Sequence, residues 1–386
     1  MTVTGPVPEP IYAEIDLTSI ANNTRILKEH AGSARLMAVV KANAYGHGAE
    51  KVARTALSNG ASWLGVARLS EAVTLREAGI EAPILIFGYT PEAGVPHLIR
   101  YALRQTVLDA DHARALSRAA EKTGAQISCH IKVDTGMGRV GFDAVEGECR
   151  DAARRCAEAI SEVVTLPGIH AEGIFTHFAT ADEADLSSAQ EQLVRFSTVL
   201  SQLEAKGLFF EVRHAANSAG ILSLPDSRFD MVRGGISLYG MNPSPVVRAD
   251  LKGVRPAMSV KGCIAQVKRV KKGCSVSYGA TWKAREETVV ATVPCGYGDG
   301  YPRLLSGRGR MLVRGQSASI LGRVCMDMTM IDVTGIEGVQ VGDEVVMMGR
   351  QGDAVVSADE IAETVGTINY EVTCMVSSRV PRVYRS

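Results

Sequence analysis

The feature that most constrains the fold is an alternation of short apolar strands with helical stretches, which runs from about residue 17 to residue 240. Between the strands, apolar residues recur at helical spacing, as in residues 111–122 and in residues 186–206, which Gly207 closes. This order of elements is typical of α/β folds. Eight strands are predicted, at residues 36–40, 63–66, 84–87, 106–108, 127–133, 173–176, 211–214 and 229–232.

Eight strand–helix units predict an α/β fold with a TIM-type (β/α)8 barrel, whose chemistry sits at the C-terminal ends of the strands. Side chains suited to chemistry or ligand binding fall at such ends: Lys41, Lys132, His177, Asn217, Ser218 and Arg233. We therefore expect the functional site at that end of the barrel.

Beyond about residue 245 the helical periodicity nearly vanishes, and short β-rich runs separated by Gly and charged turns predict a mainly-β domain. The prolines of residues 242–245 suggest a boundary, which gives a barrel domain of residues 1–245 and a β-domain of residues 246–386. Residues 11–16 form an early strand that is a candidate to pair with the β-domain. The β-rich runs are residues 257–270, 288–293, 311–313, 318–324, 329–333 and 344–348.

Composition narrows the possible partners. The 386 residues include 42 Lys and Arg and 42 Asp and Glu, so charge gives no reason to expect nucleic acid or an anionic membrane as a partner. No apolar run reaches the roughly 18 to 20 residues that span a bilayer, and residues 1–10 do not resemble a signal peptide. We expect a cytoplasmic protein with no membrane partner.

The eight cysteines show no CxxC pair and no compact spacing. This pattern favours reduced, mostly buried thiols over disulfides or a metal site.

The segment VVKANAYGHG, residues 39–48, places Lys41 where an apolar strand ends in a glycine-rich loop. Residues 49–59 behind the loop are predicted to form a helix, with Gly60 as its stop. A lysine in this position can react with an electrophile. From this segment alone, a solvated loop lysine is the commoner interpretation, since most lysines are exposed.

Seven further motifs follow in order along the chain, at residues 132–141, 176–182, 231–240, 276–282, 296–303, 322–328 and 367–372: KVDTGMGRVG, THFATAD, MVRGGISLYG, VSYGATW, GYGDGYPR, GRVCMDM and TINYEV. With VVKANAYGHG they resemble the alanine racemase family over essentially the whole chain. The resemblance implies a barrel that binds pyridoxal 5′-phosphate (PLP), a C-terminal β-domain, and a homodimer whose active sites combine residues of both subunits.

The resemblance implies two catalytic bases. Lys41 would bind PLP as a Schiff base and then act on one face of the substrate Cα, which requires its pKa to fall from the usual value near 10.4. Tyr278, from the other subunit, would act on the opposite face, within a hydrogen-bonded chain that includes His177 and Arg233. Taken alone, Tyr278 also fits a surface tyrosine, and His177 fits a core histidine.

Arg233 separates reaction classes. By resemblance it donates to the PLP pyridine nitrogen, and an arginine does not usefully protonate that nitrogen. This weakens the electron sink and argues against the related barrel decarboxylases. A simple structural interpretation is an arginine that caps the eighth strand.

The resemblance also implies the remaining cofactor contacts. Arg139 would contact the PLP phenolic oxygen, and Lys132 corresponds to a lysine that is carbamylated in some relatives, where the added negative charge would steady Arg139. The implied phosphate and ring contacts are Tyr45, Asn217, Ser218, Gly235, Ile236 and Tyr370.

For the substrate, the resemblance implies a carboxylate contact with the backbone N–H of Met326, beside Asp327 as a loop organiser, with Arg139 also in the substrate set. Tyr297 and Tyr370 would form a narrow entrance that favours a small side chain. Gly234 departs from the bulkier residue that many relatives carry.

The leading hypothesis is therefore a PLP-dependent alanine racemase, an isomerase that supplies D-alanine for peptidoglycan. A serine or broad-specificity racemase on the same scaffold is an alternative that the sequence leaves open. A non-catalytic PLP-binding protein is a third, disfavoured because such single-barrel proteins have no second domain with groups such as Tyr278 and Met326.

Overall fold

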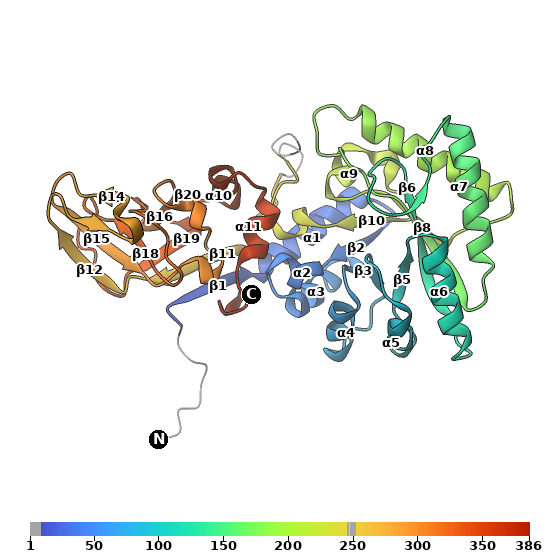
Figure 1. Ribbon diagram of the computed structural model, residues 1–386, viewed down its shortest axis with the longest axis horizontal. Coiled ribbons are helices and arrows are strands. Elements are labelled where there is room, and N and C mark those ends of the chain that lie inside the picture. The colour runs from blue at the N-terminus through green and yellow to red at the C-terminus, as the bar shows by residue number, and fades with distance from the viewer. Residues whose placement is uncertain (1–8, 245–246, 248–251) are drawn as a thin grey trace, which may run out of the picture. The chain divides into compact units, whose positions relative to one another are not determined.

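The computed structural model describes residues 9–244, 247 and 252–386 (Figure 1), and the chain divides into two compact units. The barrel unit comprises Ser19–Ala44 and Ala49–Arg255, and the β unit comprises Met1–Thr18, Tyr45–Gly48 and Pro256–Ser386. The boundary expected between residues 245 and 246 lies outside the described residues.

The barrel unit is built on eight parallel strands in the order β10-β2-β3-β4-β5-β6-β8-β9. The first and last strands of this order approach each other where the backbone N–H of Asp230 donates to the carbonyl of Arg213 at 3.0 Å, so the barrel is nearly closed. The strands are β2 (Arg35–Val39), β3 (Ala61–Val66), β4 (Ile84–Ile86), β5 (Arg104–Val107), β6 (Ile127–Asp134), β8 (Ile169–Phe175), β9 (Val212–His214) and β10 (Met231–Gly234).

Helices surround this sheet (Figure 1) because each has one apolar face. In α6 (Ala110–Glu121), Ala113, Leu116 and Ala120 are buried, and the Asp109 carboxylate caps the first turn by accepting from His112 N at 2.7 Å. The other helices are α1 (Leu17–Ala31), α3 (Ala49–Leu57), α4 (Leu69–Glu77), α5 (Val95–Arg100), α7 (Cys149–Val164), α8 (Ser187–Glu204) and α9 (Ser218–Ser223). All eight predicted strands are present to within a few residues, and the predicted barrel is confirmed.

The β unit contains two main sheets, which are antiparallel except for the parallel pair of β1 and β21. A large sheet has the order β17-β16-β19-β11-β1-β21, and a smaller one has the order β12-β15-β18. The early strand β1 (Ile11–Asp16) lies in the large sheet between β11 and β21. The remaining strands are β11 (Met258–Cys263), β12 (Gln266–Val270), β15 (Thr288–Val293), β16 (Arg310–Val313), β17 (Gln316–Ser319), β18 (Thr329–Asp332), β19 (Glu344–Gln351) and β21 (Arg382–Arg385).

Three expectations for this unit need correction. The run predicted at residues 257–270 is two strands, because the chain changes sheets: Ile264 N donates to Asp343 O and Ala265 N to Thr292 O. The strand predicted at residues 318–324 ends at Ser319. Two helices were also missed, α10 (Ala358–Val365) and α11 (Asn369–Met375), which are short and lie among β-rich segments.

All eight cysteines lie within the described residues and are thiols rather than disulfides. Three are buried, two are intermediate and three are exposed, so the expectation of mostly buried thiols is wrong. Several sit on helices or hairpins near the surface, where sequence spacing gives no sign of exposure.

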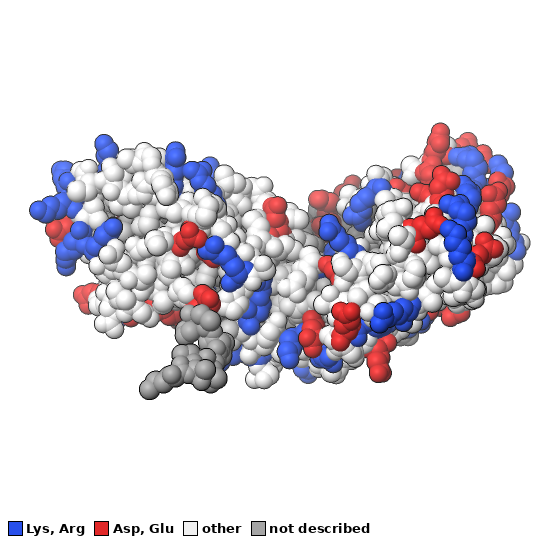
Figure 2. Space-filling view, turned by 60° about the horizontal axis from the view of Figure 1, so that its bottom comes forward, with Lys and Arg blue, Asp and Glu red and all other residues white. Residues whose placement is uncertain are grey.

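On the face drawn in Figure 2, basic and acidic side chains are interspersed, as the equal numbers of the two charges would suggest. Within the described part of the chain, no helix combines the length and the apolar character needed to cross a membrane.

Candidate active site

The chain turns in an unusual way directly after β2. Ala42, Asn43, Ala44 and Tyr45 have φ angles of 52°, 52°, 55° and 50°, in the left-handed region that non-glycine residues rarely occupy. The sequence predicts only a glycine-rich loop here. The turn brings Lys41 to the end of the first barrel strand, at the end of the barrel where we expect chemistry.

Side chains on the barrel unit hold this turn. The Glu71 carboxylate accepts from Ala42 N at 2.6 Å through Oε1, and from the backbone N–H groups of Ala67 and Arg68 at 2.8 and 3.0 Å through Oε2. The Asn43 side chain accepts from Ala49 N at 2.9 Å. Hydrogen bonds to a charged acceptor can offset the cost of left-handed backbone.

Four cations act on one histidine at this end of the barrel. Burial first, and then the charges of Arg233, Arg139, Lys132 and Lys41, hold the pKa of His177 well below its ordinary value, so the ring is neutral. The structure thus brings together, within electrostatic reach, residues that lie on strands far apart in the sequence.

Two of these cations are themselves buried. Lys132 and Arg233 are each 3% exposed. Burial, followed by the charge of Arg233, lowers the pKa of Lys132 to about 7, and burial with Arg139 lowers the pKa of Arg233 to about 9. Asp134 partly compensates Lys132, but its Oδ1 also accepts three backbone N–H groups of the following loop. Excess buried positive charge of this kind favours an anionic ligand.

Arg233 is the centre of a hydrogen-bond network. Its Nη2 donates to His177 Nδ1 at 3.0 Å, to Thr176 O at 2.9 Å and to Ala215 O at 2.8 Å, and its Nη1 donates to His214 Nδ1 at 2.9 Å. An arginine has only donors, so both histidines accept through Nδ1 and, being neutral, carry their proton on Nε2. His177 is thereby prepared to donate from Nε2.

The network continues into the barrel through residues that the sequence analysis missed. His214 Nε2 lies 2.8 Å from His130 Nδ1, and His130 Nε2 lies 3.6 Å from Glu172, beyond hydrogen-bond distance. Burial lowers the pKa of His130, so this contact is not an ion pair. Arg104 Nε donates to Glu172 at 3.1 Å. Burial alone would raise the pKa of Glu172, but contacts with His130 and Arg104 lower this pKa to about 2. One signal was present: His130 lies two residues before Lys132 in a strand and so shares its face.

A second group of predicted residues gathers at the ends of β9 and β10. The Ser218 hydroxyl accepts from Gly235 N at 2.8 Å, and Asn217 caps α9 by accepting from Gly220 N at 2.9 Å. Ile236 begins the 3-10 helix η3 (Ile236–Tyr239). At Gly234, an added Cβ would lie 3.2 Å from Leu27 Cδ1 and 3.3 Å from Leu36 Cδ1, so a larger residue would require these side chains to move.

In the β unit, Tyr45 and Tyr370 lie near each other. Their ring centroids are 6.2 Å apart and tilted by 52°. Burial first, and then Tyr370, raises the pKa of the Tyr45 phenol, so Tyr45 stays protonated and can donate.

Tyr278 also lies in the β unit, and its side chain is 70% exposed. It begins a short 3-10 turn, η5 (Tyr278–Ala280), between β13 (Ser275–Val276) and β14 (Trp282–Lys283). The other predicted catalytic residues, Lys41, His177 and Arg233, all belong to the barrel unit.

The loops that carry Tyr297, Met326 and Asp327 pack on each other. Tyr297 N donates to Cys325 O at 3.0 Å, and Gly298 N donates to Met326 O at 2.8 Å. Arg379 then joins the loops through two ion pairs of 2.6 Å, one to Asp299 and one to Asp327. Met326 and Tyr297 remain exposed at their side chains.

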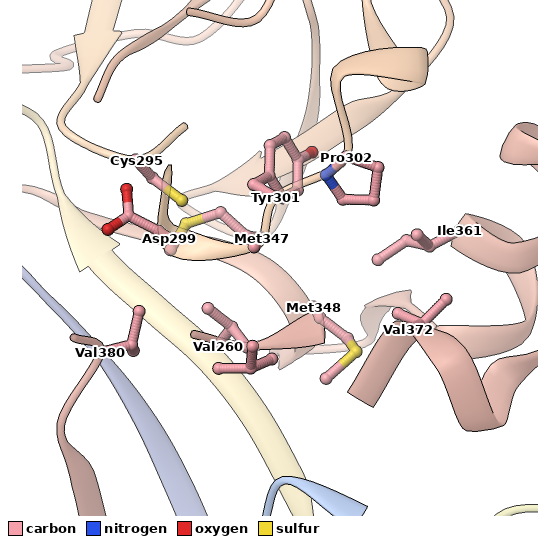
Figure 3. Close-up of a pocket in the computed structure, with 12 residues that line it drawn as sticks. Val260, Cys295, Asp299, Tyr301, Pro302, Met347, Met348, Ile361, Val372 and Val380 are labelled. Carbon is pink, nitrogen blue, oxygen red and sulfur yellow. The ribbon is translucent and has the colours of Figure 1, made fainter. Parts of the chain in front are cut away.

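A pocket lies behind these loops within the β unit (Figure 3). Its walls are mainly apolar and include Val260, Met347, Met348 and Ile361, with the buried Cys295 and Tyr301 on one side. It contains none of the predicted site residues. We assign it to packing beneath the Gly296–Arg303 segment rather than to the active site.

A parallel β/α barrel with a lysine after its first strand, excess buried positive charge and a separate β unit defines a class of two-domain barrel enzymes suited to an anionic cofactor. The alanine racemase N-terminal domain model matches residues 15–243, and the alanine racemase C-terminal domain model matches residues 257–384. The chain belongs to the alanine racemase family.

Individual alanine racemases are similar to this chain over nearly its whole length. An alanine racemase of Desulfosudis oleivorans is 51% identical over 97% of this chain and 96% of its own length. A solved alanine racemase of Bacillus anthracis has a TM-score of 0.92 at 38% identity, covering 99% of this chain and 96% of that one, and an alanine racemase of Clostridium difficile has a TM-score of 0.91 at 37% identity, covering 98% and 96%. The expected racemase activity, isomerase class and PLP cofactor are confirmed by this membership.

Proposed function

We propose that the protein interconverts L-alanine and D-alanine through Lys41 and Tyr278, two bases on opposite faces of the substrate Cα, and so supplies D-alanine for peptidoglycan. The observation that carries this proposal is the 3.0 Å hydrogen bond from Arg233 to His177 Nδ1, which orients a neutral histidine among four cations.

The residues at the barrel mouth fit PLP. The negative charges of the PLP phosphate and phenolic oxygen would balance the excess positive charge of the buried cations. Arg139, the residue assigned to the phenolic oxygen, is exposed at the strand ends. When bound, PLP supplies the electron sink that removal of an α-proton requires.

Lys41 is the base on one face. A lysine amine accepts a proton only when it is neutral, so the proposed role requires that its neighbours disfavour protonation; Lys132, Arg139 and Arg233, whose charges act with that of Lys41 on His177, are the candidates. The left-handed turn after Lys41 holds the end of the strand from which this amine extends.

Tyr278 is the base on the opposite face, supplied by a second copy of the chain. Its exposed phenol is available to another subunit. His177 carries its proton on Nε2 and would donate to the Tyr278 oxygen, which favours the phenolate and makes the tyrosine a better base. Arg233 fixes that tautomer and, with a pKa of about 9, remains protonated at neutral pH.

The phosphate set combines hydroxyls with backbone donors. Gly235 and Ile236 are the proposed N–H donors at the start of η3, and Ser218 is the proposed hydroxyl. The Gly235 N–H donates to the Ser218 hydroxyl in the structure, so the phosphate would have to share or replace that bond. Tyr45 and Tyr370 supply phenols that stay close together in the β unit. Asn217 caps the helix that begins with Ser218 and orients it.

Lys132 is the proposed carbamylation site. With its pKa near 7, a large fraction of its amine is neutral at neutral pH, and the neutral amine would add to carbon dioxide and lose one proton to solvent, which leaves the carbamate anion. The carbamate anion would offset Arg139 and Arg233. A carbonyl signal in the 13C NMR spectrum with labelled bicarbonate, absent in Lys132→Gln, would support this; no such signal would refute it.

The substrate carboxylate would accept from Met326 N, for which no partner is found among the described residues. Asp327 pairs with Arg379, which supports a role in organising the loop. Arg139 would add a positive charge near the substrate. Tyr297 and Tyr370 would restrict the side chain to about the size of methyl, a filter that discriminates between alanine and serine only modestly.

The proposed assembly is a homodimer in the cytoplasm. Exposed Tyr278, Tyr297 and Met326 on one unit form a surface that a second copy would cover.

The direct test follows the circular dichroism of L-alanine mixed with PLP-loaded protein. Racemisation predicts decay to zero, because the enantiomers have equal free energy. A parallel series compares kcat/KM for alanine and serine, with carbon dioxide release as a check for decarboxylation. A stable alanine signal would overturn the proposal, and a higher kcat/KM for serine would replace alanine by serine.

A further inference from the structure

The backbone before Tyr278 is strained. Ser277 has φ 68° and ψ 177°, a region that essentially only glycine occupies. The Tyr278 side chain is largely exposed, so contacts around its ring do little to direct it. Its direction therefore depends on the backbone of Ser277.

A hydrogen bond explains why serine stands here instead of glycine. The Ser277 hydroxyl donates to Arg323 O at 2.5 Å and lies 3.4 Å from Cys325 Sγ. Glycine would adopt this backbone more easily but has no hydroxyl.

The partner of this hydrogen bond belongs to a second functional loop. Arg323 and Cys325 precede Met326, the residue proposed to receive the substrate carboxylate. The two segments approach closely at Gly322, where an added Cβ would lie 2.6 Å from Val276 O and 2.9 Å from Ser277 Cβ. The hydroxyl of Ser277 thus links the segment of residues 277–280, the Tyr278 loop, to the segment of residues 322–328, the Met326 loop, within one unit.

We propose that Ser277 is a positioning residue for Tyr278: its hydrogen bond to the Arg323 carbonyl holds the strained backbone and fixes the phenol relative to the Met326 loop. This inference rests on the proposed role of Tyr278 as the second base.

Two substitutions separate positioning from stability. In Ser277→Gly the strain is relieved and the hydrogen bond is lost, so kcat should fall about tenfold while the thermal midpoint stays at or above that of the unchanged protein. In Ser277→Ala the strain remains without the hydrogen bond, so kcat and the thermal midpoint should both fall. A purely structural role would make kcat follow the midpoint in both variants.

Ala102→Gly is the matched control. Ala102 has φ 47° and lies in the barrel unit. Replacing it by glycine also relieves left-handed strain and should raise the thermal midpoint, but it should leave kcat unchanged because no proposed catalytic group depends on this turn.

A double-variant cycle links the effect to Tyr278. In a Tyr278→Phe background, Ser277→Gly should cost less than about twofold in kcat, since no phenol remains to be positioned. A further tenfold loss would overturn the inference, as would an unchanged kcat in Ser277→Gly alone. If Tyr278→Phe itself kept full activity, the proposed function would fail and this inference with it, so the two failures are distinguishable.

Discussion

The loops that carry the two proposed bases both place non-glycine residues at positive φ but leave their side chains in different surroundings. Ala42–Tyr45 after Lys41 and Ser277 before Tyr278 both have positive φ without glycine, and in each case a side chain bonds to backbone to hold the strain. Lys41 is half-buried near buried cations, whereas Tyr278 is 70% exposed. The charged groups around Lys41 thus come from its own barrel unit, whereas the exposed phenol of Tyr278 has no such buried surroundings among the described residues of its own β unit.

The largest effect is expected at the buried side of this comparison. Lys41→Ala removes both the cofactor's attachment point and one base, so racemisation should fall by about 10⁴-fold or more, and the yellow absorbance of PLP-loaded protein should be lost. Lys51→Ala, an exposed lysine on α3, is the control and should keep both. Retention of measurable two-way racemisation by Lys41→Ala would contradict the assignment.

The exposed side should respond differently. Tyr278→Phe removes one phenolic oxygen, so racemisation should fall by about 10²- to 10⁴-fold while the yellow absorbance remains. Tyr89→Phe changes an exposed tyrosine of the barrel unit and should have no effect. An unchanged rate in Tyr278→Phe would mean that the second base lies elsewhere.

Mixing these two inactive variants tests whether a second copy completes the site. If Tyr278 acts in the partner's site, a mixed dimer of Lys41→Ala and Tyr278→Phe has one site with both lesions and one with neither. Random exchange should then restore about a quarter of the original activity, since half of the dimers are mixed and each has one intact site. If each chain used its own Tyr278, every site would keep a lesion and mixing would restore nothing.

Much of this arrangement could be predicted from the sequence. Buried parallel strands read as short apolar runs, so all eight barrel strands, and with them the strand ends that carry Lys41, Lys132 and Arg233, were predicted. The family motifs supplied the roles assigned to these residues, which remain proposals. The β unit was predicted less well because Ile264 and Ala265 pass between two sheets without any local signal.

The missed features depend on contacts between distant residues. The sequence KANAY has no glycine in the turn, and its left-handed form depends on Glu71, 29 residues from Ala42. The His214–His130 contact joins side chains 84 residues apart. Local sequence propensity does not predict either contact, because each depends on residues that only the folded chain brings together.

The smallest effect should come from the residue that holds the Lys41 turn. Glu71 uses one oxygen for Ala42 N and the other for two amides of its own helix start. Glutamine has a single acceptor oxygen, so Glu71→Gln leaves one side unpaired and should cost about 1 to 3 kcal/mol of stability. Because Lys41 lies directly before the turn, kcat should also fall, by a few-fold.

Glu77→Gln is the matched control on α4, where the carboxylate accepts from the Tyr101 hydroxyl at 3.1 Å and from no other group in the described part of the chain. It should change neither stability nor kcat appreciably. Thermal unfolding and steady-state racemisation of the two variants give the comparison. If Glu71→Gln lost stability but kept kcat, the left-handed turn would serve the fold alone. Strained backbone would then have a proposed catalytic use only at Ser277, before Tyr278.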